Sequence, residues 1–453
     1  MNILQIAHSF PPHSLGGAEI YTFHLCSELA KKHNVSVFHR VCEQGQEEYR
    51  LSAKRKEDLS VYTINNTFKH CYSFKGLYCN SSIDIEFEEI LKKINPDVVH
   101  IQHLIFLSIG IIEKIKKYKI PIIFTLHDYW LICPQWHYLK NKSIICNNNN
   151  ELDCLECVSS WLYIHRLSKR IYHFLKRKFI KNIRLIKQLQ DIYTTTSRNL
   201  SNSKKTINMI EERRISMREI CNEVEMFLSP SEFLREKFIE FGIPERKILL
   251  VKHGINETLF ANCGARKEKG RLIFGFIGTI LPAKGLHILI EAFNKLNHND
   301  KSNLRIYGKL YPYNGFEYYP EYIKKIGLNN QNIHFMGDFD NRQIGEIFAG
   351  IDILVVPSIW LENAPLTIQE AFCAKVPVIA SRIGGIPEIV TDSLNGLLFN
   401  LGDTDDLAEK IKFVIDNPGV ISKFKGNIPE IKNIAENAQE IEELYISLIS
   451  KNK

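Results

Sequence analysis

Two carboxylates, Glu362 and Glu370, flank a predicted strand-to-helix boundary. The preceding residues 351–357 are apolar and β-branched, as in a buried parallel strand, and residues 365–375 have the pattern of a helix with proline near its first turn. Glu362 is therefore expected on the loop at the carboxyl end of a strand, where open α/β sheets bind ligands. Glu370 can face the same crevice and accept hydrogen bonds from the vicinal hydroxyls of a ribose. Taken alone, the pair also fits an exposed loop glutamate and a helix-surface glutamate.

Two glycine-bearing loops have the same setting between a strand and a helix. Gly16 and Gly17 precede an expected helix, and glycines there let backbone N–H groups approach an anion such as phosphate. In the second half of the chain, Gly278, Thr279 and Lys284 also lie between a strand and a helix, so Lys284 is a candidate point charge for a diphosphate. Each loop alone also fits an ordinary turn or a surface lysine.

Strands and helices that would position these residues alternate in two series. The first series has a helix at 18–32 and expected strands at 3–7, 35–39, 97–102 and 120–127. The second has a helix at 286–296 and expected strands at 272–277, 304–308, 333–337, 351–357 and 377–381. This βαβ rhythm predicts an α/β fold with two Rossmann-like, parallel-sheet domains.

A polar, glycine-bearing stretch divides the chain into two expected domains. The first covers 1–255 and carries Cys-rich and basic insertions at about 133–215, and the second covers 270–425. A helix within 430–453 is long enough to cross back onto the first domain. At 453 residues the chain is too long for one ordinary core, which agrees with this division.

Composition narrows the class of protein. A hydrophobic content of 45% and a charged content of 24% are those of a globular protein, and no apolar run approaches the roughly 20 residues that span a bilayer. The first residues alternate like a strand and lack the basic start of a secretory signal. An odd count of 11 cysteines then favours a reducing cytoplasm over a disulfide framework.

Four cysteines in the insertion have spacings that partly match a structural zinc site. They are Cys133, Cys146, Cys154 and Cys157, and they end in a C-x-x-C pair. An otherwise polar insertion lacks a core of its own, so a metal crosslink would stabilise it. Buried free thiols are the alternative.

Residues 161–190 carry nine basic side chains and no acidic one. Apolar residues recur there near helical spacing, so the segment could lie on an anionic membrane surface. A helix packed on the domain with a solvated basic face is the alternative. Binding to nucleic acid is not expected, because no recognised nucleic-acid module accompanies the segment.

Taken together, these segments resemble glycosyltransferase family 4, retaining nucleotide-sugar-dependent enzymes with the GT-B fold. The resemblance covers nearly the whole chain and rests on the glycine pair of the first loop, on residues 125–128, 278–285 and 362–370, and on Gly384 to Glu388. It implies two domains that close over a UDP- or GDP-sugar, without a cofactor for catalysis.

The resemblance also implies roles for individual residues. Gly17 would meet the diphosphate or the sugar, His127 would hydrogen-bond the transferred sugar, and Lys284 would neutralise phosphate. Glu362 would contact the sugar and Glu370 would hold the ribose. Further donor contacts would come from Gly16, Thr279, Asn363, Ala364, Pro365 and Leu366. Many relatives have arginine where this chain has Thr279, so Lys284 and backbone amides must carry more of the diphosphate.

The resemblance, together with the composition and the basic segment, implies a cytoplasmic, membrane-peripheral glycosyltransferase. It would move a sugar to a glycan or lipid-linked acceptor in bacterial surface polysaccharide or lipopolysaccharide synthesis. One alternative is a GT-B enzyme that processes its nucleotide sugar without an acceptor, such as an epimerase. Another is a non-catalytic module that binds sugar nucleotides.

Overall fold

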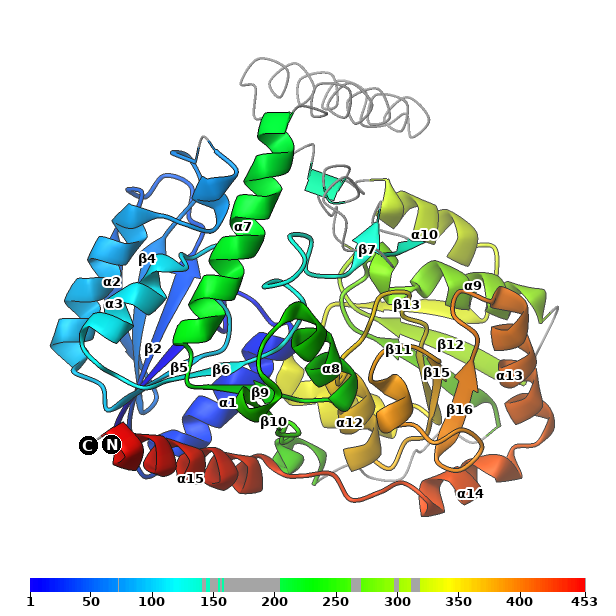
Figure 1. Cartoon of the computed structure of the whole chain (residues 1–453). Helices are drawn as coiled ribbons and strands as arrows, with labels where there is room; N and C mark the ends of the chain where they lie inside the picture. The colour runs from blue at the N-terminus through cyan, green and yellow to red at the C-terminus, as the bar shows by residue number, and fades with distance from the viewer. Residues whose placement is uncertain are drawn as a thin grey trace.

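Two α/β domains stand side by side in the computed structural model of this chain (Figure 1). The structure describes residues 1–71, 73–140, 144–146, 154, 157–158, 204–261, 270–296, 301–310 and 318–452. The basic segment 161–190 lies outside these residues. The prediction of two Rossmann-like, parallel-sheet domains is confirmed.

The first domain is built on an eight-stranded sheet in the order β10-β9-β6-β5-β1-β2-β4-β3. Its strands are β1 Asn2–Ala7, β2 Asn34–Val41, β3 Leu51–Lys56, β4 Leu59–Asn65, β5 Val98–Ile101, β6 Ile122–Thr125, β9 Met226–Ser229 and β10 Ile248–Leu250. All neighbours pair in parallel except β3 and β4. The sequence did not predict β3, because its polar side chains are mostly exposed and lack the pattern of a buried strand.

Alternating side chains send the two faces of this sheet into different cores. Leu4 and Ile6 pack with α2 (Ser81–Ile94), α3 (Gly110–Lys117) and α7 (Lys204–Glu223), whereas Ile3 packs with α1 (Gly17–Ala30). Successive strand residues point to opposite faces, so both faces need apolar residues when helices cover both. Helix α8 (Glu232–Phe241) connects β9 to β10, and a two-stranded hairpin joins β7 (Leu139–Lys140) to β8 (Ile144–Ile145).

The second domain has a six-stranded, fully parallel sheet in the order β13-β12-β11-β14-β15-β16. Its strands are β11 Leu272–Ile277, β12 Ser302–Tyr307, β13 Ile333–Gly337, β14 Ile353–Val356, β15 Val378–Ser381 and β16 Gly396–Phe399. Its helices are α9 Leu286–Lys295, α10 Tyr319–Gly327, α11 Ile344–Ala349, α12 Leu366–Cys373, α13 Thr404–Asp416 and α14 Gly419–Gly426. Buried residues of α11 and α12 share one core with the first domain, and those of α9 and α13 form a separate core.

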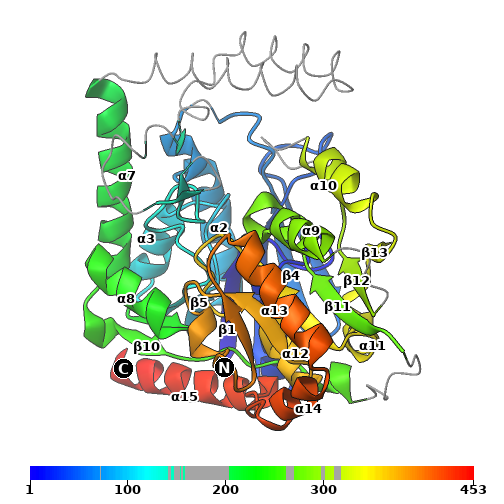
Figure 2. The ribbon, with the colours of Figure 1, turned by 90° about the vertical axis from the view of Figure 1, so that its right-hand side faces the viewer.

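The last helix, α15 (Ile434–Asn452), returns to the first domain and runs along the base of the molecule (Figures 1 and 2). Ile441 and Tyr445 are fully buried in the core that contains Tyr21 and Leu25 of α1. The Tyr21 hydroxyl donates to Asn437 Oδ1 at 2.9 Å. Within the described part of the chain, no helix is long and apolar enough to span a membrane.

Candidate active site

The glycine turn of the first domain faces helix α12 of the second. Gly16 caps α1 with extended backbone, and a β-carbon placed on Gly17 would lie 3.5 Å from Leu366 Cδ1. Leu366 is the first residue of α12, which follows the loop that carries Glu362. The turn and the acidic loop therefore lie on opposite walls of one interdomain site.

A second loop, between β11 and α9, reaches the same site. Gly285 has a φ of +69°, and a β-carbon there would lie only 1.7 Å from the Pro357 carbonyl oxygen, so no other residue fits without a shift. The Ile359 N–H donates to the Ala283 carbonyl at 2.9 Å. This close approach places Lys284 beside the loop that follows β14. Thr279, from the same β11–α9 loop, is exposed.

Lys284 and Glu362 form an ion pair in the site. Lys284 Nζ donates to Glu362 Oε1 at 2.7 Å, and Ser358 Oγ donates to the same oxygen at 2.7 Å. The Glu362 side chain is only 4% exposed, so these two donors offset the cost of burying its charge. Lys284 is 33% exposed and has three N–H donors, so it can bind a ligand phosphate while it keeps the pair.

Glu370 lies on α12 and is buried. Burial raises the pKa of its carboxyl from 4.5 to about 7, because the charged form loses hydration. Hydroxyl donors from a ligand would favour the ionised form again. Glu370 thus has the properties of a binding-site carboxyl that gains its hydrogen-bond donors when a ligand binds.

Gly384 and Gly385 support the loop that carries Glu362 and Asn363. A β-carbon on Gly384 would lie 2.0 Å from the Glu362 carbonyl oxygen, and one on Gly385 would lie 1.9 Å from that of Asn363. The Gly385 N–H donates to the Glu362 carbonyl at 2.7 Å. The backbone of the β15–β16 connection thus packs directly on the acidic loop, which fixes where its side chains point.

Asn363 connects the two domains at this point. Its Nδ2 donates to the His127 carbonyl at 2.7 Å. Its Oδ1 is buried without a partner among the described residues, and so is Trp360 Nε1. Buried polar atoms are normally hydrogen-bonded, so unpaired atoms on a loop at a strand end indicate a place for a ligand.

His127 contributes a neutral imidazole from the first domain. Its Nε2 lies 2.8 Å from Gln102 Oε1, and this amide oxygen can only accept, so Nε2 carries the hydrogen and Nδ1 keeps its lone pair. Burial, together with the nearby His253, holds the pKa of His127 well below its usual value. The ring stacks on His253 at 5.2 Å between centroids. The neutral ring can therefore accept a hydrogen bond from a ligand hydroxyl through Nδ1.

A buried relay of polar groups fixes this orientation. Gln102 Nε2 donates to Gln5 Oε1 at 3.0 Å, and Gln5 Nε2 donates to the Tyr445 hydroxyl at 2.9 Å. Because Gln102 donates through Nε2, its oxygen is the atom that faces His127. The last helix of the chain therefore helps to set the tautomer of His127.

Asp128, the neighbour of His127, is held as a carboxylate. The Ile105 N–H donates to His103 Nδ1 at 2.9 Å, so His103 Nε2 carries a hydrogen and donates to Asp128 Oδ2 at 3.1 Å. Burial opposes the charge, but His103 and the Trp130 N–H outweigh it and lower the pKa of Asp128. Asp128 Oδ1 accepts from the Trp130 N–H at 2.8 Å, which shapes the loop that follows His127.

Comparison with known proteins decides the family. Residues 15–259 match the sequence model described as Glycosyltransferase Family 4, and residues 264–440 match the one described as Glycosyl transferases group 1. The chain belongs to glycosyltransferase family 4. The resemblance identified from the sequence is therefore confirmed.

One distant relative of this family 4 protein spans most of its length. An uncharacterized 42.6 kDa protein in the cps region of Klebsiella pneumoniae is 25% identical over 427 residues, which are 92% of this chain and 94% of that protein. Anabaena HepE in complex with UDP and glucose superposes with a TM-score of 0.64 at 15% identity, covering 99% of this chain and 100% of the other. The lipopolysaccharide outer core galactosyltransferase WaaB superposes with a TM-score of 0.56 at 15% identity, covering 98% of this chain and 99% of the other. These structures show that the two domains have the GT-B fold.

Two features of this family 4 site were not predicted. Glu388 accepts hydrogen bonds from the N–H groups of Glu232 at 2.8 Å and Phe233 at 2.7 Å, so a carboxylate of the second domain caps helix α8 of the first. The relay through Gln5 and Tyr445 is the other. The sequence pointed only to Glu388, which it included as the last residue of the family motif without predicting that it caps α8.

The four cysteines predicted to bind zinc lie in the described residues and in one region. Burial raises the pKa of Cys154 to about 12, and Cys133, Cys146 and Cys157 oppose its ionisation further. Among the residues that the structure describes, no three His, Cys, Asp or Glu side chains are arranged to hold a metal ion. This geometry gives the zinc no support, and the site stays a prediction that metal analysis of the purified protein can test.

Proposed function

We propose that this family 4 protein is a retaining glycosyltransferase that uses a UDP-sugar and a glycan or lipid-linked acceptor in surface polysaccharide synthesis. Support for the pathway comes from the relative in the Klebsiella cps region and from the fold shared with WaaB. Support for the nucleotide comes from the complex of HepE with UDP and glucose. We also propose that residues 161–190 bring the enzyme to an anionic membrane surface.

One observation carries this proposal: Gly17, Lys284, Glu362 and Glu370 come from elements of both domains around one interdomain site. Glu370 would accept from the two ribose hydroxyls. Lys284 and the glycine turn would hold the diphosphate, and Glu362 and His127 would contact the sugar. The unpaired Asn363 Oδ1 and Trp360 Nε1 offer an acceptor and a donor beside them.

In the proposed reaction the bond between the sugar C1 and the diphosphate oxygen breaks, and the acceptor oxygen attacks C1 from the same face. The acceptor's proton passes to the departing diphosphate, so no protein nucleophile is needed. Negative charge grows on the diphosphate as the bond breaks, and Lys284 is already fixed by Glu362 to stabilise that charge. Neutral His127 can bind a sugar hydroxyl without repelling the cationic sugar that develops.

A two-stage experiment tests this function. Purified protein is screened for thermal stabilisation by UDP- and GDP-sugars, since a ligand at a hundredfold excess over its Kd stabilises by roughly 2.7 kcal/mol. The stabilising donor is then incubated with acceptor, and the anomeric configuration of the product is read by NMR. A product of inverted configuration would refute retention. Absence of stabilisation by every nucleotide sugar would refute the donor class.

A further inference from the structure

Two carboxylate–histidine pairs lie side by side in the first domain, close to His127. Glu19 Oε1 lies 3.3 Å from His8 Nε2, and Asp128 Oδ2 lies 3.1 Å from His103 Nε2. The imidazole rings of His8 and His103 meet edge to face, with 4.8 Å between their centroids. The two pairs therefore form one cluster, which we call the paired-carboxylate cluster.

The fold brings this cluster together at one edge of the eight-stranded sheet. His8 follows β1, His103 follows β5 and Asp128 follows β6, and β5 lies between the other two strands in parallel pairing. Glu19 comes from the first turn of α1, the helix that follows β1. Open α/β sheets bind ligands at the carboxyl ends of their strands. In the first domain the cluster thus has the position that the Glu362 loop has in the second.

Glu19 is a deeply buried carboxylate with one oxygen open to a ligand. Its side chain is 8% exposed, and Oε1 accepts from Ser14 Oγ at 2.5 Å. Burial opposes the charge, but the hydrogen bonds from His8 and Ser14 outweigh it and lower the pKa of Glu19 to about 2. Among the described residues, no other residue donates a hydrogen bond to Oε2. Buried polar atoms are normally hydrogen-bonded, so Oε2 has a place for a donor from a ligand.

Capping of α1 explains Glu19 only in part. Glu19 is the third residue of the helix, where the helix dipole favours a carboxylate, but a capping box also needs a side chain at the N-cap. The N-cap here is Gly16, and a β-carbon on it would lie 2.6 Å from Glu19 Oε2. Gly16 therefore leaves room for this carboxylate, whereas Gly17 faces Leu366 of the second domain. The glycine turn thus has one side for the donor and another side that Glu19 occupies.

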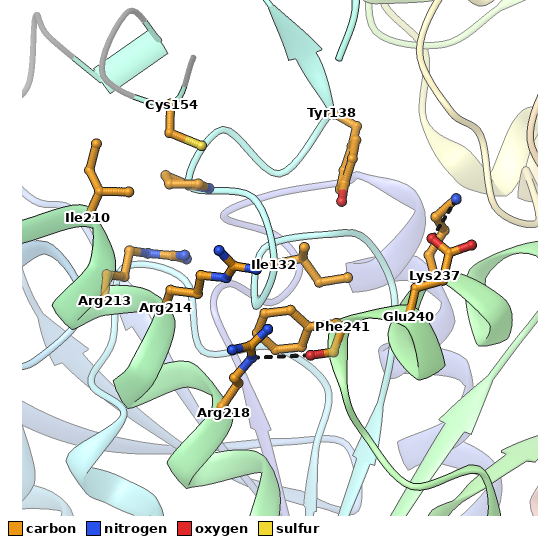
Figure 3. Close-up of a pocket in the computed structure, with 11 residues that line it drawn as sticks. Ile132, Tyr138, Cys154, Ile210, Arg213, Arg214, Arg218, Lys237, Glu240 and Phe241 are labelled. Carbon is orange, nitrogen blue, oxygen red and sulfur yellow. Dashed lines mark hydrogen bonds and ion pairs between the residues drawn. The ribbon is translucent and has the colours of Figure 1, made fainter. Parts of the chain in front are cut away.

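Asp128 lies on a loop that α7 holds in place. Its Oδ1 accepts from the Trp130 N–H at 2.8 Å, and the Trp130 carbonyl accepts from Arg213 Nη2. Figure 3 shows Arg213 and Arg218 extending from α7 beside Ile132 of the same loop. The Asp128 side chain stays 19% exposed, so a ligand can still reach it.

The chemistry of the cluster suits hydroxyls better than phosphate. An ionised carboxylate only accepts hydrogen bonds, and a sugar hydroxyl can donate one. In the part of the chain that the structure describes, no lysine or arginine pairs with Glu19 or Asp128. A phosphate would therefore meet two carboxylates without a lysine or arginine to offset the repulsion. A metal ion is not favoured either, since no three His, Cys, Asp or Glu side chains among the described residues are arranged to hold one.

We propose that Glu19 and Asp128 bind two hydroxyls of a sugar at the reacting end of the acceptor. The proposal rests on the proposed function, because it names the group that receives the transferred sugar. The acceptor is then a glycan, or a lipid that already carries a sugar, rather than a bare lipid phosphate. A reaction that attaches this earlier sugar must precede the one catalysed here.

Initial-rate assays with the full chain and the nucleotide sugar that stabilises it test the site. The acceptor probes are octyl glycosides of the common hexoses and N-acetylhexosamines, with farnesyl phosphate as the anionic probe. We expect transfer to a glycoside and none to farnesyl phosphate. Glu19→Gln and Asp128→Asn should each raise the KM for that glycoside about tenfold, as for loss of a charge-assisted hydrogen bond, and leave the KM for the nucleotide sugar unchanged.

Glu442→Gln is the matched control. Glu442 also pairs with a histidine, His33 at 3.0 Å, and its side chain is 18% exposed, much like that of Asp128. His33 follows the other end of α1, about 20 Å along the helix from Glu19. Both KM values of this variant should therefore match those of wild type. Thermal stabilisation by the nucleotide sugar checks that each variant is folded.

Monodeoxy forms of the accepted glycoside separate acceptor binding from a structural role. At one ring position, loss of the hydroxyl should raise the wild-type KM about tenfold and leave the KM of Glu19→Gln nearly unchanged. If every monodeoxy form raises the KM of wild type and of both variants by the same factor, the two carboxylates do not bind the acceptor.

The outcomes distinguish this proposal from the proposed function. Transfer to farnesyl phosphate, or to none of the probes by a protein that a nucleotide sugar stabilises, would overturn the acceptor proposal and leave the donor class intact. Absence of stabilisation by every nucleotide sugar would refute the proposed function, and the acceptor proposal with it.

Discussion

Donor affinity should depend on pH through Glu370. Its pKa of about 7 in the free protein means that the carboxyl is roughly three quarters ionised at about pH 7.5 and about 3% ionised at about pH 5.5. Ribose hydroxyls donate to the ionised form, so binding favours loss of the proton. The affinity should therefore fall as the pH is lowered, by about 25-fold over this window.

The assay is calorimetric titration with the nucleotide sugar that stabilises the protein, in wild type and in Glu370→Gln. A nucleotide sugar suits this test because its diphosphate is esterified at both ends and does not titrate in the window. The variant keeps an acceptor oxygen but loses the charge, so it should bind about tenfold or more weakly at about pH 7.5 and show a nearly flat pH profile. A wild-type affinity that stays constant, or a variant that keeps the wild-type slope, would refute the reasoning.

The pH dependence of the free protein's stability tests independently whether burial raises the pKa of Glu370. The folded-state pKa of Glu370 lies above its unfolded value of 4.5, so the folded state holds the proton more tightly. Stability should then decrease as the pH rises from about 4.5 to about 7, and the cost of the buried charge is fully present above that range. Glu370→Gln removes this cost, so the variant should be at least as stable as wild type at about pH 8.

Three further predictions concern the interdomain site. Lys284→Gln should lower kcat on the order of 10²-fold in initial-rate assays. The double variant Lys284→Gln/Glu362→Gln should lose much less kcat than the product of the two single fold-losses, because the two side chains form one pair at 2.7 Å. A double-variant loss equal to that product would contradict this. Gly385→Ala should weaken donor binding in the calorimetric titration, because its β-carbon would meet the acidic loop at 1.9 Å, whereas Gly419→Ala, with nothing within 4 Å, should bind as wild type. Glu388→Ala should lower the free energy of unfolding by about 1 kcal/mol as a lost helix cap, measured as a lower urea midpoint; an unchanged midpoint would mean that the cap contributes nothing.

The parts of the site that follow from local pattern were predictable from the sequence. The apolar strand before Glu362 and the proline before α12 are short-range signals, and parallel strands place their carboxyl ends at one edge. The structure brings Lys284 beside Glu362, as expected for two loops at that edge. The role predicted for His127 came only from the family resemblance, because a histidine after a strand has no local signature.

Other parts depend on segments that are far apart in the chain. Glu388 caps α8 across more than a hundred residues, and the partners of Gln102 become apparent only when β1 and α15 are in place. Neither periodicity nor composition specifies such pairs, because they result from how the domains pack. The edge strand β3 was missed for a different reason, since exposed polar residues can pair their backbone without an apolar pattern.

Because α15 fills the core beside α1 and supplies the hydroxyl that holds Gln5, the first domain is completed by the last part of the chain. During translation, elements β11 to α14 of the second domain leave the ribosome before this helix is available. Until then, the amino-terminal half exposes the apolar surface that α15 covers and lacks part of its buried hydrogen-bond network. Truncation before α15 would thus remove part of this core and the Tyr445 hydroxyl that holds Gln5.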